Sequence, residues 1–181
     1  MRSLVIALTA FSVALLWSPA AAAEVTSTSP GGFVLTAEAD VAASPDAAWR
    51  ALTRLNRWWN SSHTYSGDAR RLSLEPRAGG CWCETWNGNS VEHARVLTVH
   101  NLEGVRTLRL QGALGPLQEI GANGVLTFTI APHASGAKIT MTYRVSGDAA
   151  LNLPQLAPLV DQVLMEQFGR LSRYTASGSP D

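Results

Sequence analysis

The chain has 181 residues, and its 14 Lys and Arg residues balance its 14 Asp and Glu residues, so the formal net charge at pH 7 is zero. A general nucleic-acid-binding protein needs a basic surplus or a basic stripe, and this neutral composition excludes that class of partner. Hydrophobic residues make up 46% of the chain and charged residues 15%, which indicates one folded domain and not a disordered chain.

Residues 1–23 have the composition of a secretory signal peptide. Arg2 gives a positive start, an almost unbroken apolar run spans residues 4–17, and small residues end at Ala23. We expect cleavage after Ala23 and therefore a periplasmic or secreted protein. The apolar run is shorter than the ~20 residues that a membrane-spanning helix needs, so no stable membrane insertion is expected.

The rest of the chain predicts one α+β domain over residues 33–176. A flexible lead-in is expected at residues 24–32 and a disordered tail at residues 177–181. Apolar side chains alternate with smaller or polar ones over residues 33–41, which predicts the first strand of the domain.

The signals for a helix start follow this strand. Ser44 supplies an N-cap hydroxyl, Pro45 suits the first helical position, and Asp46 places an acid in the first turn. A second short helix is expected over residues 55–59, and a polar loop over residues 60–67.

The middle of the chain has the pattern of antiparallel hairpins, with short β-prone segments between turns rich in Gly, Pro and Asn. The predicted strands are residues 71–75, 80–86, 91–100, 105–112, 125–131 and 137–145. The last two alternate cleanly between apolar and polar residues, so the sheet is expected to have one dry face and one wet face.

The final segment changes to a helical period, because its apolar residues recur at intervals of three and four. They are Leu156, Leu159, Val160, Val163, Leu164, Phe168, Leu171 and Tyr174. This broad stripe predicts a long C-terminal helix, enclosed by a curved antiparallel sheet of six to seven strands. Where sheet and helix diverge, we expect a cavity that suits a small ligand.

Several short motifs follow one another in a characteristic order. They are residues 44–49 (SPDAAW), Trp58-Trp59, residues 76–84 (PRAGGCWCE), residues 108–110 (LRL) and the closing helix at 159–174. In this order they resemble the SRPBCC superfamily, which includes START-type lipid-transfer domains, polyketide cyclase/dehydrases and activator-of-heat-shock-ATPase domains. The resemblance covers roughly residues 33–175. It implies a helix-grip fold and binding of apolar ligands, with no shared catalytic residues, and residues 112–117 look like a trait of a smaller exported branch.

Cys81 and Cys83 are the only cysteines. Outside the cytoplasm they can form a local disulfide, but free thiols and bonds between chains are also open. A metal site would need His63, His93 or His100 beside the two sulfurs, and a C-x-C pattern alone is a weak metal signal. We therefore predict a structural or incidental cysteine pair, with no metal and no cofactor.

The register of the first long hairpin decides which side chains face the cavity. A four-residue turn places Glu84 opposite His93. A five-residue turn places Glu84 opposite Ala94 and Trp82 opposite Val96. The five-residue turn is favoured because Trp82 and Val96 then share the interior, and a slip of one residue would reverse every side chain.

The favoured register has two consequences. The outer face would carry Cys81, Cys83, His93 and Arg95. Glu84 would become an interior acid, and its burial would raise the carboxyl pKa towards the neutral form.

The candidate ligand-binding residues are mostly aromatic or aliphatic. They are Trp58, Trp59, His63, Tyr65, Trp82, Glu84, Trp86, Leu110, Phe128, Met141, Tyr143, Leu164 and Phe168. Each has a plainer interpretation, since large aromatic residues are more often core residues and loop histidines are more often solvated.

Two functions from different classes are consistent with these features. The favoured one is an exported module that binds a small hydrophobic or amphipathic molecule for transport or sequestration. The alternative is a cyclase- or hydrolase-type enzyme in which Glu84 transfers protons together with Tyr143 or His63. The sequence has no Ser-His-Asp arrangement, phosphate-binding glycine loop or zinc signature, and this favours the binding module.

Overall fold

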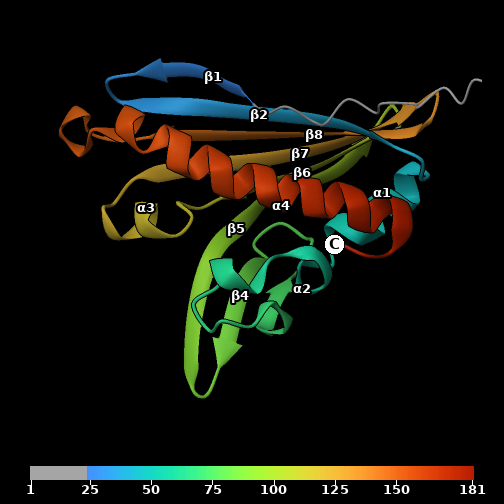
Figure 1. The fold of residues 1–181 in the computed structure, drawn as a ribbon, viewed down its shortest axis with the longest axis horizontal. Coiled ribbons are helices and arrows are strands. Elements are labelled where there is room, and N and C mark those ends of the chain that lie inside the picture. The colour runs from blue at the N-terminus through green and yellow to red at the C-terminus, as the bar shows by residue number, and fades with distance from the viewer. Residues whose placement is uncertain (1–23) are drawn as a thin grey trace, which may run out of the picture.

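The computed structural model describes residues 24–181, so the predicted signal peptide at residues 1–23 lies outside the described residues. Within this part of the chain, eight strands form one open antiparallel sheet in the order β1-β2-β8-β7-β6-β5-β4-β3. A long C-terminal helix, α4, crosses one face of the sheet (Figure 1). This is the predicted α+β architecture.

Figure 1 also shows the β4–β5 hairpin curving away from the long central strands. The strands are β1 (Glu24–Ser29), β2 (Gly32–Val41), β3 (Leu72–Leu74), β4 (Cys81–Trp86), β5 (Asn89–Leu102), β6 (Val105–Gln111), β7 (Asn123–His133) and β8 (Gly136–Ser146). The α-helices are α1 (Pro45–Leu52), α2 (Leu55–Trp58), α3 (Pro116–Glu119) and α4 (Ala157–Ser177). Single 3₁₀ turns occur at Ser61–His63, Ala69–Arg71, Ala149–Leu151 and Leu153–Gln155.

The sheet exceeds the predicted six to seven strands because residues 24–29, expected as a flexible lead-in, form the edge strand β1. This strand pairs antiparallel with β2, where Val25 faces Leu35, and Val25 packs against the hydrophobic core. Gly32 begins β2 at a point where a Cβ atom would collide with the carbonyl oxygen of Val145. The absence of that Cβ lets β2 and β8 approach closely.

The helix boundaries follow local chemistry. Ser44 caps α1 as predicted, since its Oγ accepts a hydrogen bond from the backbone N–H of Ala47 at 3.2 Å. Helix α4 ends at Gly178, whose φ of 82° suits the left-handed cap conformation. The last residues, expected to be disordered, fold back on α4, where Arg173 Nε donates to the carbonyl of Pro180 at 2.8 Å.

The core lies between the sheet and α4. The alternation predicted for β7 and β8 holds, since one face of each strand is buried along its length. The buried residues from these strands and α4 are Leu126, Phe128, Ile130, Ile139, Met141, Tyr143, Val145, Leu164, Phe168 and Leu171.

The β4–β5 hairpin adopts neither of the registers considered above. Its turn is only two residues long, because Trp86 pairs directly with Asn89. Asn87 and Gly88 have φ angles of 46° and 81°, the positive values that a tight type I′ turn requires. Glu84 therefore pairs with Val91.

A β-bulge then shifts the register of this hairpin. Cys83 pairs with Glu92, whereas Trp82 pairs with Ala94, so His93 is an additional residue in β5. Because a bulge breaks the alternation of faces, His93 and Ala94 are adjacent and both buried. The predicted outer-face position of His93 is wrong, because the two-residue turn puts His93 on the same face as Val91 and Glu84.

Candidate functional site

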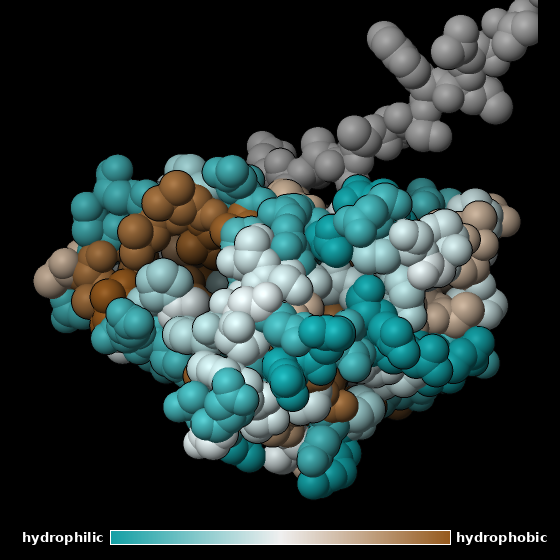
Figure 2. Space-filling model, turned by 60° about the horizontal axis from the view of Figure 1, so that its bottom comes forward, coloured by the Kyte–Doolittle hydropathy of each residue, from teal (hydrophilic) through white to brown (hydrophobic). Residues whose placement is uncertain are grey.

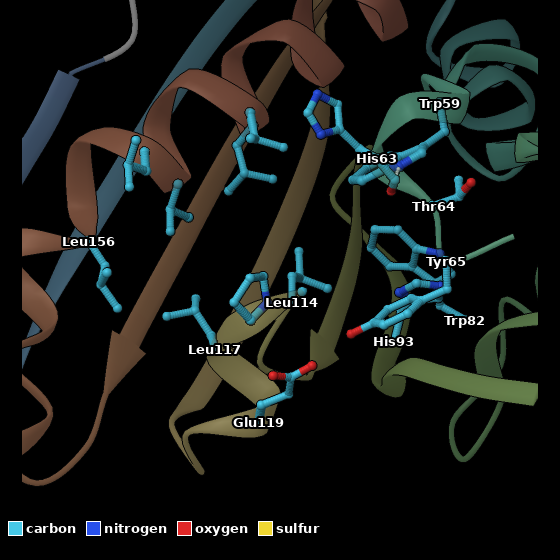
Figure 3. A pocket seen from close by; sticks show the side chains of 16 residues that line it. Trp59, His63, Thr64, Tyr65, Trp82, His93, Leu114, Leu117, Glu119 and Leu156 are labelled. Atoms are coloured by element: carbon cyan, nitrogen blue, oxygen red, sulfur yellow. Dashed lines mark hydrogen bonds between the residues drawn. The ribbon is translucent and has the colours of Figure 1, made fainter. Parts of the chain in front are cut away.

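A cavity of about 490 Å³ lies beside the N-terminal half of α4 (Figure 3). The other walls come from α3 with its preceding loop, from the segment after α2, and from the β4–β5 hairpin. The lining residues are Trp59, His63, Thr64, Tyr65, Trp82, His93, Leu114, Gly115, Pro116, Leu117, Glu119, Leu156, Leu159, Val160, Val163 and Leu164. Figure 2 shows hydrophobic residues gathered around a hollow on one side of the molecule.

The structure brings five of the candidate residues to this cavity: Trp59, His63, Tyr65, Trp82 and Leu164. Trp59 and Trp82 meet edge to face, with their ring centroids 4.9 Å apart. The Trp59 indole N–H donates to the carbonyl of His63 at 2.9 Å. The aromatic wall and the loop after α2 therefore support each other.

Most other candidates are core residues that do not line the cavity. Five of them are almost fully buried in the hydrophobic cluster between sheet and helix: Trp58, Leu110, Phe128, Met141 and Phe168. The Trp58 indole N–H donates to the carbonyl of Ala51 at 3.0 Å and so joins α2 to α1. Trp86 is half-buried beside the hairpin turn and is also absent from the cavity wall.

Tyr143 has a positioning role behind the cavity. Its hydroxyl donates to the carbonyl of Gly112 at 3.1 Å and accepts from the backbone N–H of Leu114 at 2.9 Å. Burial raises the pKa of Tyr143 to about 12. Tyr143 therefore stays protonated at neutral pH and holds the segment before α3, from which Leu114 lines the cavity.

Glu84 is an interior acid, as predicted, and its side chain is fully buried. Its Oε1 accepts from the backbone N–H of Ser66 at 2.6 Å. Its Oε2 accepts from the backbone N–H of Tyr65 at 3.1 Å and from Nε2 of His93 at 3.0 Å. The carboxylate thus joins β4 to both the loop after α2 and the bulge of β5.

These contacts reverse the predicted pKa shift of Glu84. Burial raises the carboxyl pKa, but the hydrogen bonds from Ser66, Tyr65 and His93 together outweigh burial, and the net pKa lies below its usual value. Hydrogen bonds to the charged form of an acid favour that form. Glu84 is therefore a carboxylate at neutral pH and not the neutral acid expected from burial alone.

His93 is the residue that the Glu84 carboxylate supports at the cavity wall. Its ring lies 5.7 Å from the ring of Trp82 and 5.7 Å from that of Tyr65, measured between centroids. Burial lowers the pKa of His93, and this effect exceeds the opposing influence of Glu84. The imidazole is therefore neutral at pH 7.

The loop after α2 is also tied to α4. The backbone N–H of Asn60 donates to Oε1 of Gln167 at 2.8 Å, and His63 Nε2 lies 3.0 Å from Oε2 of Glu166. The Asn60 side chain also bonds to Glu166, and this contact lowers the Glu166 pKa. His63, expected near the cavity mouth, thus both lines the cavity and anchors the loop.

The two cysteines form the local disulfide, one of the alternatives that the sequence left open. Cys81 and Cys83 are bonded across Trp82, with their Cα atoms 5.4 Å apart. In this form neither sulfur is a thiolate ligand. Among residues 24–181, three or more His, Cys, Asp or Glu side chains nowhere converge in a group that could hold a metal ion.

Several lining residues are not among the candidates that the sequence pattern indicated. Leu156, Leu159, Val160 and Val163 belong to the predicted apolar stripe of the last helix, but the stripe alone does not indicate which end faces a void. The sequence around α3 did not indicate a cavity. It showed only that residues 112–117 look like a trait of a smaller exported branch. The Asn-Gly turn is the signal for His93, because a two-residue turn puts His93 on the same face as Glu84, whereas the favoured five-residue turn put it on the outer face.

Comparisons with known proteins bear on the fold alone. No family model and no curated protein matches the chain. An uncharacterized protein from Rhizobium leguminosarum is 16% identical, with a TM-score of 0.52 over 86% of this chain and 97% of that chain. A protein of unknown function from Enterococcus faecalis, EF2215, is 14% identical, with a TM-score of 0.51 over 82% and 74%. CalU16 from Micromonospora echinospora is 16% identical, with a TM-score of 0.50 over 89% and 85%.

Proposed function

We propose that this protein binds a small hydrophobic or amphipathic molecule in the cavity beside α4, as a carrier or sequestering module. The observation that carries the proposal is the cavity of about 490 Å³, whose walls are mainly aliphatic and aromatic. Cavities of this size and character are typical of small-molecule sites. Two lining side chains, Tyr65 and Leu159, are 45% and 63% exposed, so the cavity reaches the surface.

The resemblance to the SRPBCC superfamily supports the same function. An open antiparallel sheet with one long C-terminal helix agrees with a helix-grip fold, and members of that superfamily bind apolar ligands. We place the chain in this superfamily, near the polyketide cyclase or heat-shock-ATPase-activator branches.

We further propose that the protein is exported. The support comes from the composition of residues 1–23 and from the bond between Cys81 and Cys83, since disulfides persist in oxidising compartments. No helix within residues 24–181 is both long and apolar enough to cross a membrane.

The contacts of Glu84 favour a structural role over the enzymatic alternative. Both of its oxygens already accept hydrogen bonds from the protein, and it is not a lining residue. Tyr143, its suggested partner in proton transfer, is engaged with the segment before α3. A general acid has to reach the reacting group directly or through one water molecule, and these two groups do not line the cavity.

Binding of the neutral fluorescent probe N-phenyl-1-naphthylamine tests the proposal. We expect saturable fluorescence enhancement with wild-type protein. Val163→Trp fills the cavity from α4 and should weaken binding at least about tenfold, which corresponds to a loss of about 1.4 kcal/mol.

Gln162→Trp is the matched control, because Gln162 is the exposed neighbour of Val163 on the same helix and does not line the cavity. This variant should bind the probe as the wild type does. Equal binding by both variants, or no binding by the wild type, would contradict the proposal. Native mass spectrometry of protein from its own host should also detect a bound small molecule.

A further inference from the structure

The polar side chains that line the cavity are few, and none of them belongs to Lys or Arg. They are His63, Thr64, Tyr65, His93 and Glu119. A ligand that carries a carboxylate, sulfate or phosphate would meet no Lys or Arg side chain there. The Glu84 carboxylate behind His93, together with Glu119, would also repel it.

The contact between Glu84 and His93 fixes which imidazole nitrogen carries the proton. A carboxylate can only accept hydrogen bonds, so His93 Nε2 must donate to Glu84 Oε2 across their 3.0 Å contact. In a neutral imidazole the other nitrogen, Nδ1, is then an acceptor. Loss of the Nε2 proton is opposed by the same carboxylate, which makes this tautomer the stable one.

Nδ1 of His93 is available to a ligand. None of the described residues forms a hydrogen bond with Nδ1. It is also not one of the fully buried polar atoms without a partner among residues 24–181, so it keeps some solvent-accessible surface. The imidazole is otherwise buried, with 8% of its residue surface exposed, and it lines the cavity. The remaining exposure is therefore towards the cavity, where His93 lies beside Tyr65 and Trp82 (Figure 3).

We propose that His93 Nδ1 accepts a hydrogen bond from a ligand hydroxyl, so that the cavity selects neutral alcohols or phenols over ethers and anions of the same shape. This proposal rests on the ligand-binding function proposed above and names its ligand class. Glu84 acts as a positioning residue, because it sets the tautomer and orientation of His93 without touching the ligand. The aliphatic side chains of α4 and α3 then bind the apolar part of the molecule.

Three naphthalene probes of nearly equal shape test this selectivity by displacing N-phenyl-1-naphthylamine. They are 2-naphthol, 2-methoxynaphthalene and 2-naphthoate. One hydrogen bond is worth about 0.5–1.5 kcal/mol net, so 2-naphthol should bind about two- to thirteenfold more tightly than the methyl ether. The naphthoate should bind most weakly.

His93→Phe should abolish the preference for 2-naphthol while the methyl ether still binds. His100→Phe is the control, since His100 lies on the same strand but does not line the cavity. If the phenylalanine variant does not fold, nitrogen NMR of the wild-type imidazole gives the answer directly. His93 should show a protonated Nε2 and a bare Nδ1, and 2-naphthol should shift the Nδ1 resonance.

The outcomes separate the two proposals. Equal affinity for naphthol and its methyl ether, or an Nδ1 resonance that naphthol does not move, would overturn the role of His93 but leave ligand binding intact. Failure of every neutral probe to bind would overturn the binding function itself.

Discussion

Replacing Glu84 by glutamine should destabilise the fold while preserving the size of the side chain. The wild-type carboxylate accepts three hydrogen bonds, from the backbone N–H groups of Tyr65 and Ser66 and from His93 Nε2, at 3.1, 2.6 and 3.0 Å. A glutamine offers one oxygen, so its NH2 group must face at least one of these donors. Water does not replace the lost acceptor, because Glu84 is 0% exposed.

The magnitude follows from these contacts. A hydrogen bond to a charged group contributes about 1.5–3 kcal/mol, and an unsatisfied buried donor costs about 1–3 kcal/mol. The amide oxygen keeps one or two of the three bonds without the charge. We therefore expect the free energy of unfolding to fall by about 2–4 kcal/mol.

Urea unfolding followed by tryptophan fluorescence measures this change, with the slope of the denaturation curve expected to stay constant. Glu75→Gln is the matched control, since the Glu75 side chain is 58% exposed in a surface pair with Arg77. It should change the unfolding free energy by less than about 0.5 kcal/mol. A loss for Glu84→Gln as small as that of the control would refute the view that this carboxylate holds the loop and the bulge together.

Three further predictions concern pH and redox state. The folded-state pKa values of Glu84 and His93 both lie below their usual 4.5 and 6.5, so the unfolded chain binds more protons than the folded one as the pH falls. Urea unfolding at a series of pH values should therefore show stability falling below about pH 6.5 and again below about pH 4.5. Tyr143→Phe should cost about 1–3 kcal/mol at neutral pH. This variant should also lack the wild-type loss of stability as pH rises from 10.0 towards about 12. Denatured, unreduced protein should show no free thiol, and opening the Cys81–Cys83 bond should cost about 1–2 kcal/mol, because the closed loop is so short.

The elements that sequence reasoning placed correctly are those with strong local signals. Ser44, Pro45 and Asp46 define the start of α1 through an N-cap bond, a fixed φ angle and a favourable charge, all within one turn. Strands β7 and β8 and helix α4 were predictable because their apolar residues are regularly spaced. The spacing is two residues in the strands and three or four in the helix. In contrast, the segment that forms β1 is rich in Ser and Thr, and its pairing with β2 gives it a structure that its own composition does not indicate.

The candidate site was less predictable, because it depends on where packed layers separate. Phe128 and Leu164 both lie on apolar faces, yet only Leu164 reaches the cavity. The sequence pattern is the same for a residue that meets another layer and for one that meets a void. The cavity lies at the N-terminal half of α4, and no periodicity in that helix distinguishes its two ends.

The bulge in β5 explains how one hairpin can serve both the core and the site. With regular alternation from the two-residue turn, Val91 and His93 would face inward with Glu84, and Ala94 would face outward. The additional residue lets Ala94 pair with Trp82 in the core while His93 also turns inward, within 3.0 Å of Glu84. The cost of burying the carboxylate is offset by the His93 contact and two backbone donors, and these same contacts leave one imidazole nitrogen free at the cavity. The two-residue turn therefore supplies the cavity with its hydrogen-bond acceptor, and the bulge lets the same strand also contribute Ala94 to the core.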